Sequence, residues 1–324
     1  MKKFLLSSFV VFFSILITIF IFEKFLIWEN YYLPFSNPTK ISIKDITYTF
    51  LFDKPIDETK KQVYVIGDSF TEGASCAHEK KNLTSHLNEQ LNQYNYQIIN
   101  LGSSGKSLPN YIDFIHHFKI TPNDKVILIL YDNDIGFSDE MCSISLRHKK
   151  DIDLFSPNQC EQIVSKEINV DANNNFLRQI NNYLKKYLTY KMIKEAVWQF
   201  SFFRKLMYRS ELQNLWINFE SEENKYIIEA IKYIKSVVFS NKGEFYLTYF
   251  PNVNNISNND FRHGLWKKFL SYIKEVHNIN YFDPYPYFIK NSAQNQMVWS
   301  LTDNHPNCEA HKLMSDYIRK TIIF

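Results

Sequence analysis

Short apolar runs alternate with helix-length segments from residue 61 onward, and this alternation limits the fold of the chain more than any other feature. We predict strands at five such runs: Val63–Ile66, Tyr96–Asn100, Lys125–Tyr131, Glu244–Phe250 and Asn280–Phe282. We predict helices at Leu83–Gln93, Pro109–Phe118, Glu222–Phe239, Asp260–Val276 and, last, near Glu309–Ile323. Strands separated by helices favour a mostly parallel sheet that helices cover on both faces. The expected fold class is therefore α/β, with one domain over residues 61–324.

Composition narrows the class of partner. The chain has 324 residues, of which 45% are hydrophobic, so residues 61–324 are enough for one α/β domain of ordinary to large size. The net charge of +3 is too small to argue for nucleic acid, and no basic cluster has the spacing of a nucleic-acid motif. Neither the cysteines nor the histidines have the spacing of metal ligands. We therefore expect no nucleic-acid partner, no metal and no cofactor.

The N-terminal segment has the pattern of a membrane anchor. Residues 4–22 carry no charge and are mostly apolar, which is long enough for a helix that spans a bilayer. No small residues that would form a cleavage site follow, so we predict an uncleaved signal anchor over residues 1–28. Lys2 and Lys3 favour a cytoplasmic N-terminus, which would place the rest of the chain outside the cytoplasmic membrane. Residues 29–60 contain Pro34, Pro38 and Pro55, and we interpret them as a linker into the domain.

The alternation of strands and helices stops at about residues 143–221. This insert begins as a polar loop and becomes helical from about Phe176 to Leu212. Its basic residues stand among aromatic ones: Lys185, Lys186, Lys191, Lys194, Arg204, Lys205 and Arg209. One interpretation is a lid or an amphipathic surface that meets anionic membrane. The other, which we favour, is an extra helical layer on the core with solvated basic residues.

Four cysteines, Cys76, Cys142, Cys160 and Cys308, leave their redox state open. Cys142 and Cys160 flank a polar loop and are placed to close it as a disulfide, which an extracytoplasmic location permits. The alternative is four free thiols. The sequence favours neither.

Gly67-Asp68-Ser69, at the end of the first predicted strand, is a candidate nucleophile turn. The segment from Glu72 through Leu91 has helical spacing, so the serine would lie near a helix N-terminus. Free backbone N–H groups and the positive end of the helix dipole stabilise an oxyanion there. Taken alone, the same three residues also form ordinary turns and N-caps, with Asp68 bonding the turn.

Three further blocks follow in order. Asn100-Leu101-Gly102-Ser103-Ser104-Gly105 comes after the second predicted strand, Asp132-Asn133-Asp134 after the third, and Asp303-Asn304-His305-Pro306 near the C-terminus. Together with Gly67-Asp68-Ser69, these blocks resemble the SGNH (GDSL-type) hydrolase family. The resemblance implies a flavodoxin-like SGNH hydrolase fold. It also identifies Ser69, Gly105, Asn133 and His305 as the four residues that give the family its name.

The chemistry of an ester-cleaving serine assigns a role to each block. Ser69 needs a base within hydrogen-bond reach, for which His305 is the candidate, and Asp303 is the nearest acid to orient the imidazole. The backbone N–H of Ser69, the backbone N–H of Gly105 and the side-chain amide of Asn133 would form the oxyanion hole. We expect Gly105 to be glycine because substrate must approach the backbone closely there.

The chain departs from the family pattern at two positions, one in the Asn133 loop and one before His305. Tyr131 stands where the family's third block usually has a glycine two residues before the asparagine, and its bulk would narrow the pocket or shift the loop. Thr302 stands where the family more often has its acid, three residues before the histidine. Asp303, two residues before it, matches a spacing found in family members related to cell-envelope polysaccharide modification. A Ser–His dyad is the fallback.

The same segment continues as Lys106-Ser107, so that Gly102-Ser103-Ser104-Gly105-Lys106-Ser107 ends like a phosphate-binding loop. A full loop of that kind needs a glycine five residues before Gly105, where the chain has Asn100. We therefore set a nucleotide-binding function aside.

The expected function is a membrane-anchored serine esterase that acts on an acyl ester of a cell-envelope glycan or lipid. One alternative is an O-acyltransferase that uses the same nucleophile to modify a surface polysaccharide. Another is a catalytically inactive SGNH-like domain that binds glycans, for which Tyr131 is the best support. The acyl group, the alcohol and the oligomeric state are not readable from the residues.

Overall fold

The computed structural model describes residues 39–43, 46–50, 52, 55–73, 76, 80–134, 222–253, 256, 261–292, 297–300 and 303–323. The predicted anchor at 1–28 and the predicted insert at about 143–221 lie outside these residues, as do Cys142 and Cys160. Among the helices of the described part, none combines the length and the hydrophobicity that crossing a membrane requires. Of Asn133 and Asp303, only the backbone is described.

Five parallel strands form the central sheet, as the alternating pattern predicts. They are β3 (Lys61–Gly67), β4 (Tyr96–Gly102), β5 (Lys125–Leu130), β6 (Glu244–Tyr249) and β7 (Tyr281–Phe282), in the spatial order β4-β3-β5-β6-β7. All four neighbouring pairs are parallel. The chain begins in an inner strand and reverses direction between β4 and β5, which is the strand order of flavodoxin-like sheets. The loops after β3, β4 and β5 therefore meet at one edge of the sheet.

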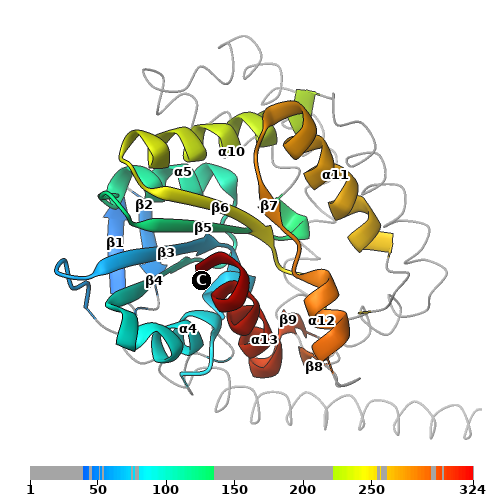
Figure 1. Cartoon of the computed structure of the whole chain (residues 1–324), viewed down its shortest axis with the longest axis horizontal. Coiled ribbons are helices and arrows are strands. Elements are labelled where there is room, and N and C mark those ends of the chain that lie inside the picture. The colour runs from blue at the N-terminus through cyan, green and yellow to red at the C-terminus, as the bar shows by residue number, and fades with distance from the viewer. Residues whose placement is uncertain are drawn as a thin grey trace, which may run out of the picture. The chain divides into compact units, whose positions relative to one another are not determined.

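Helices cover both faces of this sheet (Figure 1). On one face lie α4 (Leu83–Leu91) and α13 (Cys308–Ile318), whose Leu87 and Met314 join Val63 and Ile127 in one buried cluster. On the other face lie α5 (Leu108–His117), α10 (Glu222–Ser240) and α11 (Phe261–His277). Successive residues of a strand point to opposite faces, so Tyr64 and Val126 join this second cluster. A shorter helix, α12 (Tyr285–Asn291), follows β7.

A hairpin replaces part of the predicted linker at residues 29–60. It consists of β1 (Thr39–Ile43) and β2 (Ile46–Phe50), which pair antiparallel. Phe50 is fully buried, and its ring lies 5.0 Å from the ring of Phe114 on α5 between centroids. The linker prediction is wrong for these residues. It gave weight to the prolines on either side and overlooked the two-residue hydrophobic period of Thr39–Phe50.

The helical spacing from Glu72 through Leu91 does not form one continuous helix: a short helix precedes Gly73, and a longer one matches the helix predicted at Leu83–Gln93. The first, α2 (Ser69–Glu72), is a single turn that ends at Gly73, whose φ of 62° is left-handed. The second, α4, begins after Asn82, whose side chain accepts a hydrogen bond from the N–H of Ser85 at 2.9 Å. A left-handed glycine terminates a helix, and an asparagine N-cap begins the next one.

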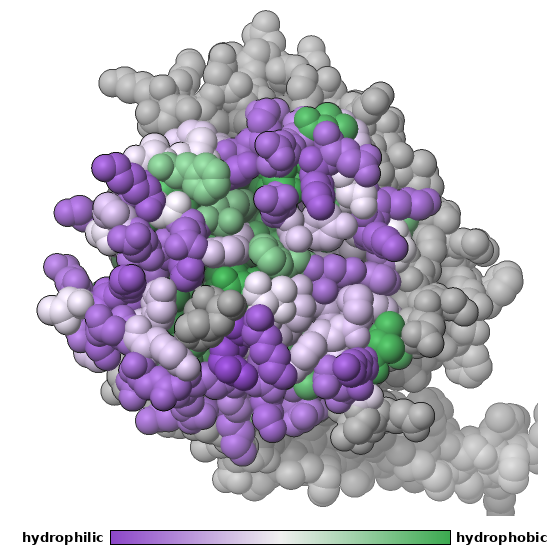
Figure 2. Space-filling view, viewed as in Figure 1, coloured by the Kyte–Doolittle hydropathy of each residue, from purple (hydrophilic) through white to green (hydrophobic). Residues whose placement is uncertain are grey.

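Near the C-terminus, a short antiparallel ribbon precedes the last helix. It pairs β8 (Val298–Ser300) with β9 (Asp303–Pro306), and the sequence did not predict it. Asn307 then caps α13, which continues as a wider turn, η3 (Arg319–Ile323). Figure 2 shows that the described surface on one face of the molecule is mainly hydrophilic, because the apolar residues are largely enclosed in the two clusters.

Candidate active site

Ser69 is the first residue of α2 and follows the inner strand β3 after one residue, Asp68. Asp68 is the N-cap, and its Oδ1 accepts a hydrogen bond from the N–H of Phe70 at 2.9 Å. Its backbone oxygen accepts from the N–H of Glu72, also at 2.9 Å. The first N–H groups of a helix have no partner within the helix itself, so the N–H of Ser69 belongs to a group that suits an oxyanion. Asp68 thus bonds the turn, as predicted, and in doing so sets the direction of α2.

Two glycines allow α2 to lie directly on the sheet. A Cβ at Gly102, at the end of β4, would be 2.2 Å from the backbone nitrogen of Glu72. A Cβ at Gly67, at the end of β3, would be 2.1 Å from Oγ1 of Thr71. Neither position has room for a side chain. These contacts fix the height of the nucleophile turn above the strand ends.

His305 reaches Ser69 from the other end of the sequence. It lies on β9, and its Nε2 is 2.9 Å from Oγ of Ser69, although 236 residues separate the two. The imidazole also lies over Phe70, with the ring centroids 5.0 Å apart. A hydroxyl within hydrogen-bond distance of an imidazole nitrogen is the arrangement of a nucleophile with its base. The structure therefore brings together the two residues whose contact matters most.

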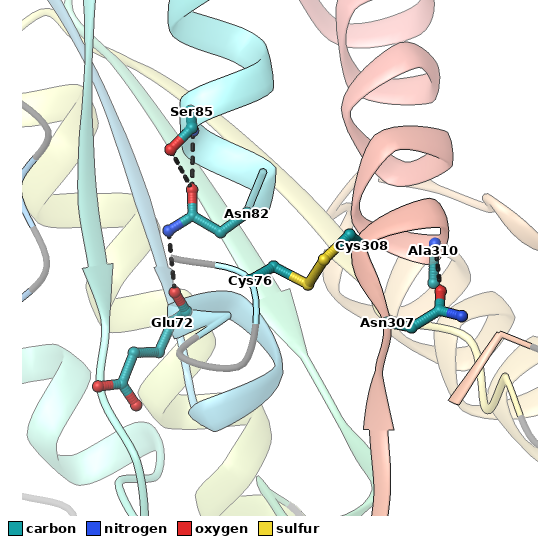
Figure 3. The surroundings of a disulfide bond; sticks show 7 residues. All are labelled: Glu72, Cys76, Asn82, Ser85, Asn307, Cys308 and Ala310. Atoms are coloured by element: carbon teal, nitrogen blue, oxygen red, sulfur yellow. Dashed lines mark hydrogen bonds between the residues drawn. A yellow bond between two sulfur atoms is a disulfide. The ribbon is translucent and has the colours of Figure 1, made fainter. Parts of the chain in front are cut away.

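A disulfide joins the segments that carry these two residues (Figure 3). Cys76, just after the α2 turn, is bonded to Cys308, the first residue of α13 and the third after His305. The alternative of four free thiols is thus wrong. The alternative pairing of Cys142 with Cys160 involves residues outside the description. The sequence could have indicated the pair Cys76 and Cys308, because each of them follows a block that was expected at the same edge of the sheet.

Gly105 lies in the loop after β4, the strand that pairs with β3. Its φ of 68° is left-handed, and a Cβ there would meet nothing within 4 Å. Backbone conformation, and not crowding by neighbouring residues, is what favours glycine here. The neighbouring Ser104 donates a hydrogen bond from Oγ to Oε2 of Glu72 on α2. This bond connects the Gly105 loop to the nucleophile turn. Burial raises the pKa of the Glu72 carboxyl.

The remaining two predicted residues are placed by their backbone alone. Asn133 is in a single turn, η2 (Asp132–Asp134), which follows β5, the other neighbour of β3. Asp303 is the first residue of β9, two residues before His305. The loops of Gly105 and Asn133 thus follow the two strands on either side of the nucleophile strand.

Tyr131 packs against the nucleophile turn. Its ring stacks on Phe70 with the centroids 3.5 Å apart, and its side chain is largely buried. Its hydroxyl accepts a hydrogen bond from Nδ2 of Asn252 at 3.3 Å. The sequence analysis singled out Tyr131 but missed Phe70. The ring of Phe70 contacts both the ring of Tyr131 and the imidazole of His305.

Within the described residues, no group of three or more His, Cys, Asp or Glu side chains is placed to hold a metal ion. Two other histidines pair with side chains away from Ser69. His116 bonds Tyr233, with Nε2 and the hydroxyl 2.8 Å apart, and His263 lies 3.1 Å from Asp283.

The chain is similar to several proteins of solved structure. No family model and no curated protein matches the chain. A member of the lipolytic protein G-D-S-L family from Veillonella parvula is 15% identical, with a TM-score of 0.43, and the match covers 81% of this chain and 98% of that one. The acetylxylan esterase Axe2 from Geobacillus stearothermophilus is 14% identical, with a TM-score of 0.40 and coverage of 82% and 94%. The psychrotrophic esterase EstA from Pseudoalteromonas is 13% identical, with the same TM-score and coverage of 82% and 97%. At such low similarity, any conclusion about function has to come from the residues of this chain.

Proposed function

We propose that this protein is a serine ester hydrolase of the SGNH type, with Ser69 as nucleophile and His305 as base. The observation that carries the proposal is the 2.9 Å contact between Oγ of Ser69 and Nε2 of His305. As Oγ attacks the ester carbonyl, Nε2 takes its proton, and the imidazolium then gives that proton to the leaving alcohol. Water, activated by the same imidazole, hydrolyses the acyl-enzyme and restores Ser69.

The oxyanion hole of this proposal uses three loops at one sheet edge. The backbone N–H groups of Ser69 and Gly105 and the side-chain amide of Asn133 would donate to the oxyanion of the tetrahedral intermediate. The positions of these residues after β3, β4 and β5 support the assignment. Each donor of this kind stabilises the transition state by about 3 kcal/mol.

We assign the orienting acid to Asp303, since β9 carries both Asp303 and His305. An acid that accepts from Nδ1 of the histidine fixes the tautomer that presents a free Nε2 to serine. If Asp303 does not have this role, Ser69 and His305 act as a dyad. Replacement of Asp303 by Asn separates the two cases, because only an orienting acid makes kcat fall by orders of magnitude.

The proposed location is outside the cytoplasmic membrane, with residues 1–28 as a single-pass anchor. The disulfide between Cys76 and Cys308 supports this, because disulfides persist mainly in oxidising compartments. The substrate class that fits the location is an acyl ester of an envelope glycan or lipid. Transfer of the acyl group to a sugar hydroxyl, in place of water, would use the same nucleophile.

Substitution of Ser69 tests the proposal. With p-nitrophenyl acetate as substrate, Ser69→Ala should lower kcat by at least about 1,000-fold, because the acyl-enzyme no longer forms. Ser236→Ala is the matched control, since Ser236 lies exposed on α10 and bonds its own helix through the oxygen of Tyr233. Circular dichroism and thermal melting verify that both variants fold. Turnover by Ser69→Ala equal to that of Ser236→Ala would overturn the assignment.

A further inference from the structure

One tyrosine contacts both loops that flank the nucleophile strand. Tyr111 lies on α5 and is fully buried. Its hydroxyl is 3.2 Å from the backbone oxygen of Lys106, the residue after Gly105. The same hydroxyl is 2.7 Å from Oδ1 of Asp134, the residue after Asn133. A single side chain therefore bridges the Gly105 loop and the Asn133 turn.

The number of hydrogens on Tyr111 and Asp134 bears on which of the two donates the hydrogen bond between them. A tyrosine hydroxyl has one hydrogen, whereas a backbone carbonyl can only accept. If the Asp134 carboxyl were ionised, it too would only accept, and the one hydrogen of Tyr111 would have to be shared between two acceptors. Each of the two contacts has a hydrogen of its own only when Oδ1 of Asp134 carries one. The other carboxyl oxygen, Oδ2, accepts from the N–H of Tyr131 at 2.7 Å.

We propose that Asp134 is a neutral carboxylic acid that donates to Tyr111, which donates in turn to Lys106, and that this chain sets the spacing of the two oxyanion loops. Tyr111 and Asp134 are then positioning residues. The protonation state is independent of the activity, whereas the effect on catalysis rests on the proposed function.

The surroundings of Asp134 favour the neutral form. The side chain is buried, and burial is the main cause that raises the pKa of its carboxyl well above the usual range. The nearby acids Asp68 and Asp132 also raise this pKa, whereas the hydrogen bonds with Tyr111 and with the N–H of Tyr131 lower it, and burial outweighs them. An ionised carboxylate here would face two like charges in a poorly solvated site.

Tyr111 also explains how the turn at Asn133 is held. Asp134 bonds Tyr131 twice, through Oδ2 to the Tyr131 N–H and through its own N–H to the Tyr131 oxygen at 3.0 Å. Asn133 lies between these two anchored residues. Movement of Asp134 away from Tyr111 would therefore shift the turn that carries Asn133 relative to Gly105. Oxyanion donors act through their exact positions, so a small shift weakens them.

Infrared difference spectroscopy tests the proton without any need for turnover. The spectrum of the full-length protein at pH 7 minus that of Asp134→Asn should show the carbonyl band of a protonated carboxylic acid. A difference spectrum with carboxylate bands alone would overturn the proposal. The Asn variant is a conservative replacement, because its NH₂ can donate to Tyr111 while its oxygen accepts from Tyr131.

Tyr111→Phe tests the spacing of the loops. Its matched control is Tyr249→Phe, which removes another buried tyrosine hydroxyl that donates to an acid, Asp283, at 2.8 Å. Tyr111→Phe, and not the control, should increase amide hydrogen exchange at residues 103–106 and 132–134. Equal exchange in both variants would overturn the proposal.

Ester turnover then measures the consequence for catalysis. Tyr111→Phe should lower kcat by about 10- to 100-fold with KM changed less than about threefold, because the oxyanion donors act in the transition state. Asp134→Asn should retain kcat within about threefold, whereas Asp134→Leu should lose it as Tyr111→Phe does. An unchanged kcat in Tyr111→Phe would contradict the positioning role. If the wild type has no esterase activity, the proposed function fails, while the infrared and exchange results still decide the inference.

Discussion

The sulfur atoms of Cys76 and Cys308 are bonded to each other across a sequence separation of 232 residues. Cys76 follows the turn that begins with Ser69, and Cys308 follows the strand that carries His305. The hydrogen bond between Ser69 and His305 therefore lies between two segments that are covalently joined next to it. This linkage couples the stability of the fold to the geometry of the candidate active site.

Loss of the disulfide should affect both stability and turnover. The double variant Cys76→Ser/Cys308→Ser should be less stable by about 2–5 kcal/mol, because the unfolded chain is no longer constrained by so long a loop. We also expect a lower kcat, since His305 loses a neighbouring anchor. Urea unfolding and ester kinetics measure the two effects. Dithiothreitol should reproduce both effects in the wild type and change nothing further in the double variant; a reduced wild type with native stability would contradict the role of this bond.

Three glycines should respond differently to alanine. Gly102→Ala should destabilise by about 1–3 kcal/mol or more, because the new Cβ would meet the backbone of Glu72 at 2.2 Å. Gly105→Ala should cost about 1 kcal/mol, since its φ is left-handed but its surroundings are open. Gly264→Ala, on the open surface of α11, should stabilise by about 0.5–1 kcal/mol. Denaturant unfolding gives this order, and a Gly102→Ala variant as stable as Gly264→Ala would contradict the close packing of α2 on β4.

His311 should make the protein sensitive to acid. This histidine on α13 is fully buried, and neither ring nitrogen has a hydrogen-bond partner among the described residues. Burial lowers its pKa to about 3, so the folded protein holds it neutral while the unfolded chain takes up a proton below about pH 6.5. Stability from this group is therefore present above pH 6.5 and is lost as the pH falls toward 3.

The loss that His311 causes between pH 7 and pH 4 should be about 3 kcal/mol. Unfolding of the wild type and of His311→Gln at both pH values isolates it, because the other titrating groups are common to the two proteins. The glutamine variant should start less stable at pH 7 but lose less on acidification. An equal loss in both proteins would show that His311 does not titrate as its burial requires.

The pattern of strands and helices was predictable because the hydrophobic residues of each segment are also the residues that the fold buries. Val63, Val126 and Leu247 lie in strands that are buried on both faces, so each strand reads as an apolar run. Most boundaries agree with the prediction to within two residues. The hairpin at Thr39–Phe50 was missed because its alternating pattern is short and lies between prolines. The end of α2 at Gly73 was not predicted, because periodicity alone does not detect a left-handed residue.

The residues of the candidate site could be proposed from the sequence, but the contacts around them could not. The order of four short blocks indicated Ser69 and His305. Parallel strands explain why the loops of Ser69, Gly105 and Asn133 meet, whereas His305 arrives on β9 of a separate antiparallel ribbon. The stacking of Phe70 on Tyr131, the bridge by Tyr111 and the disulfide at Cys76 depend on how helices pack on the sheet. No local pattern in the sequence encodes those contacts. Tyr131, singled out for its bulk, belongs to the packing that supports the nucleophile turn.

Covalent labelling of Ser69 tests the central claim most directly. A fluorophosphonate reacts with a serine only when a base and oxyanion donors activate it. We predict one adduct per chain in the intact mass, located by peptide sequencing to Ser69, absent in Ser69→Ala and strongly slowed in His305→Gln. A wild-type protein that forms no adduct, or one that remains labelled after Ser69→Ala, would contradict the account.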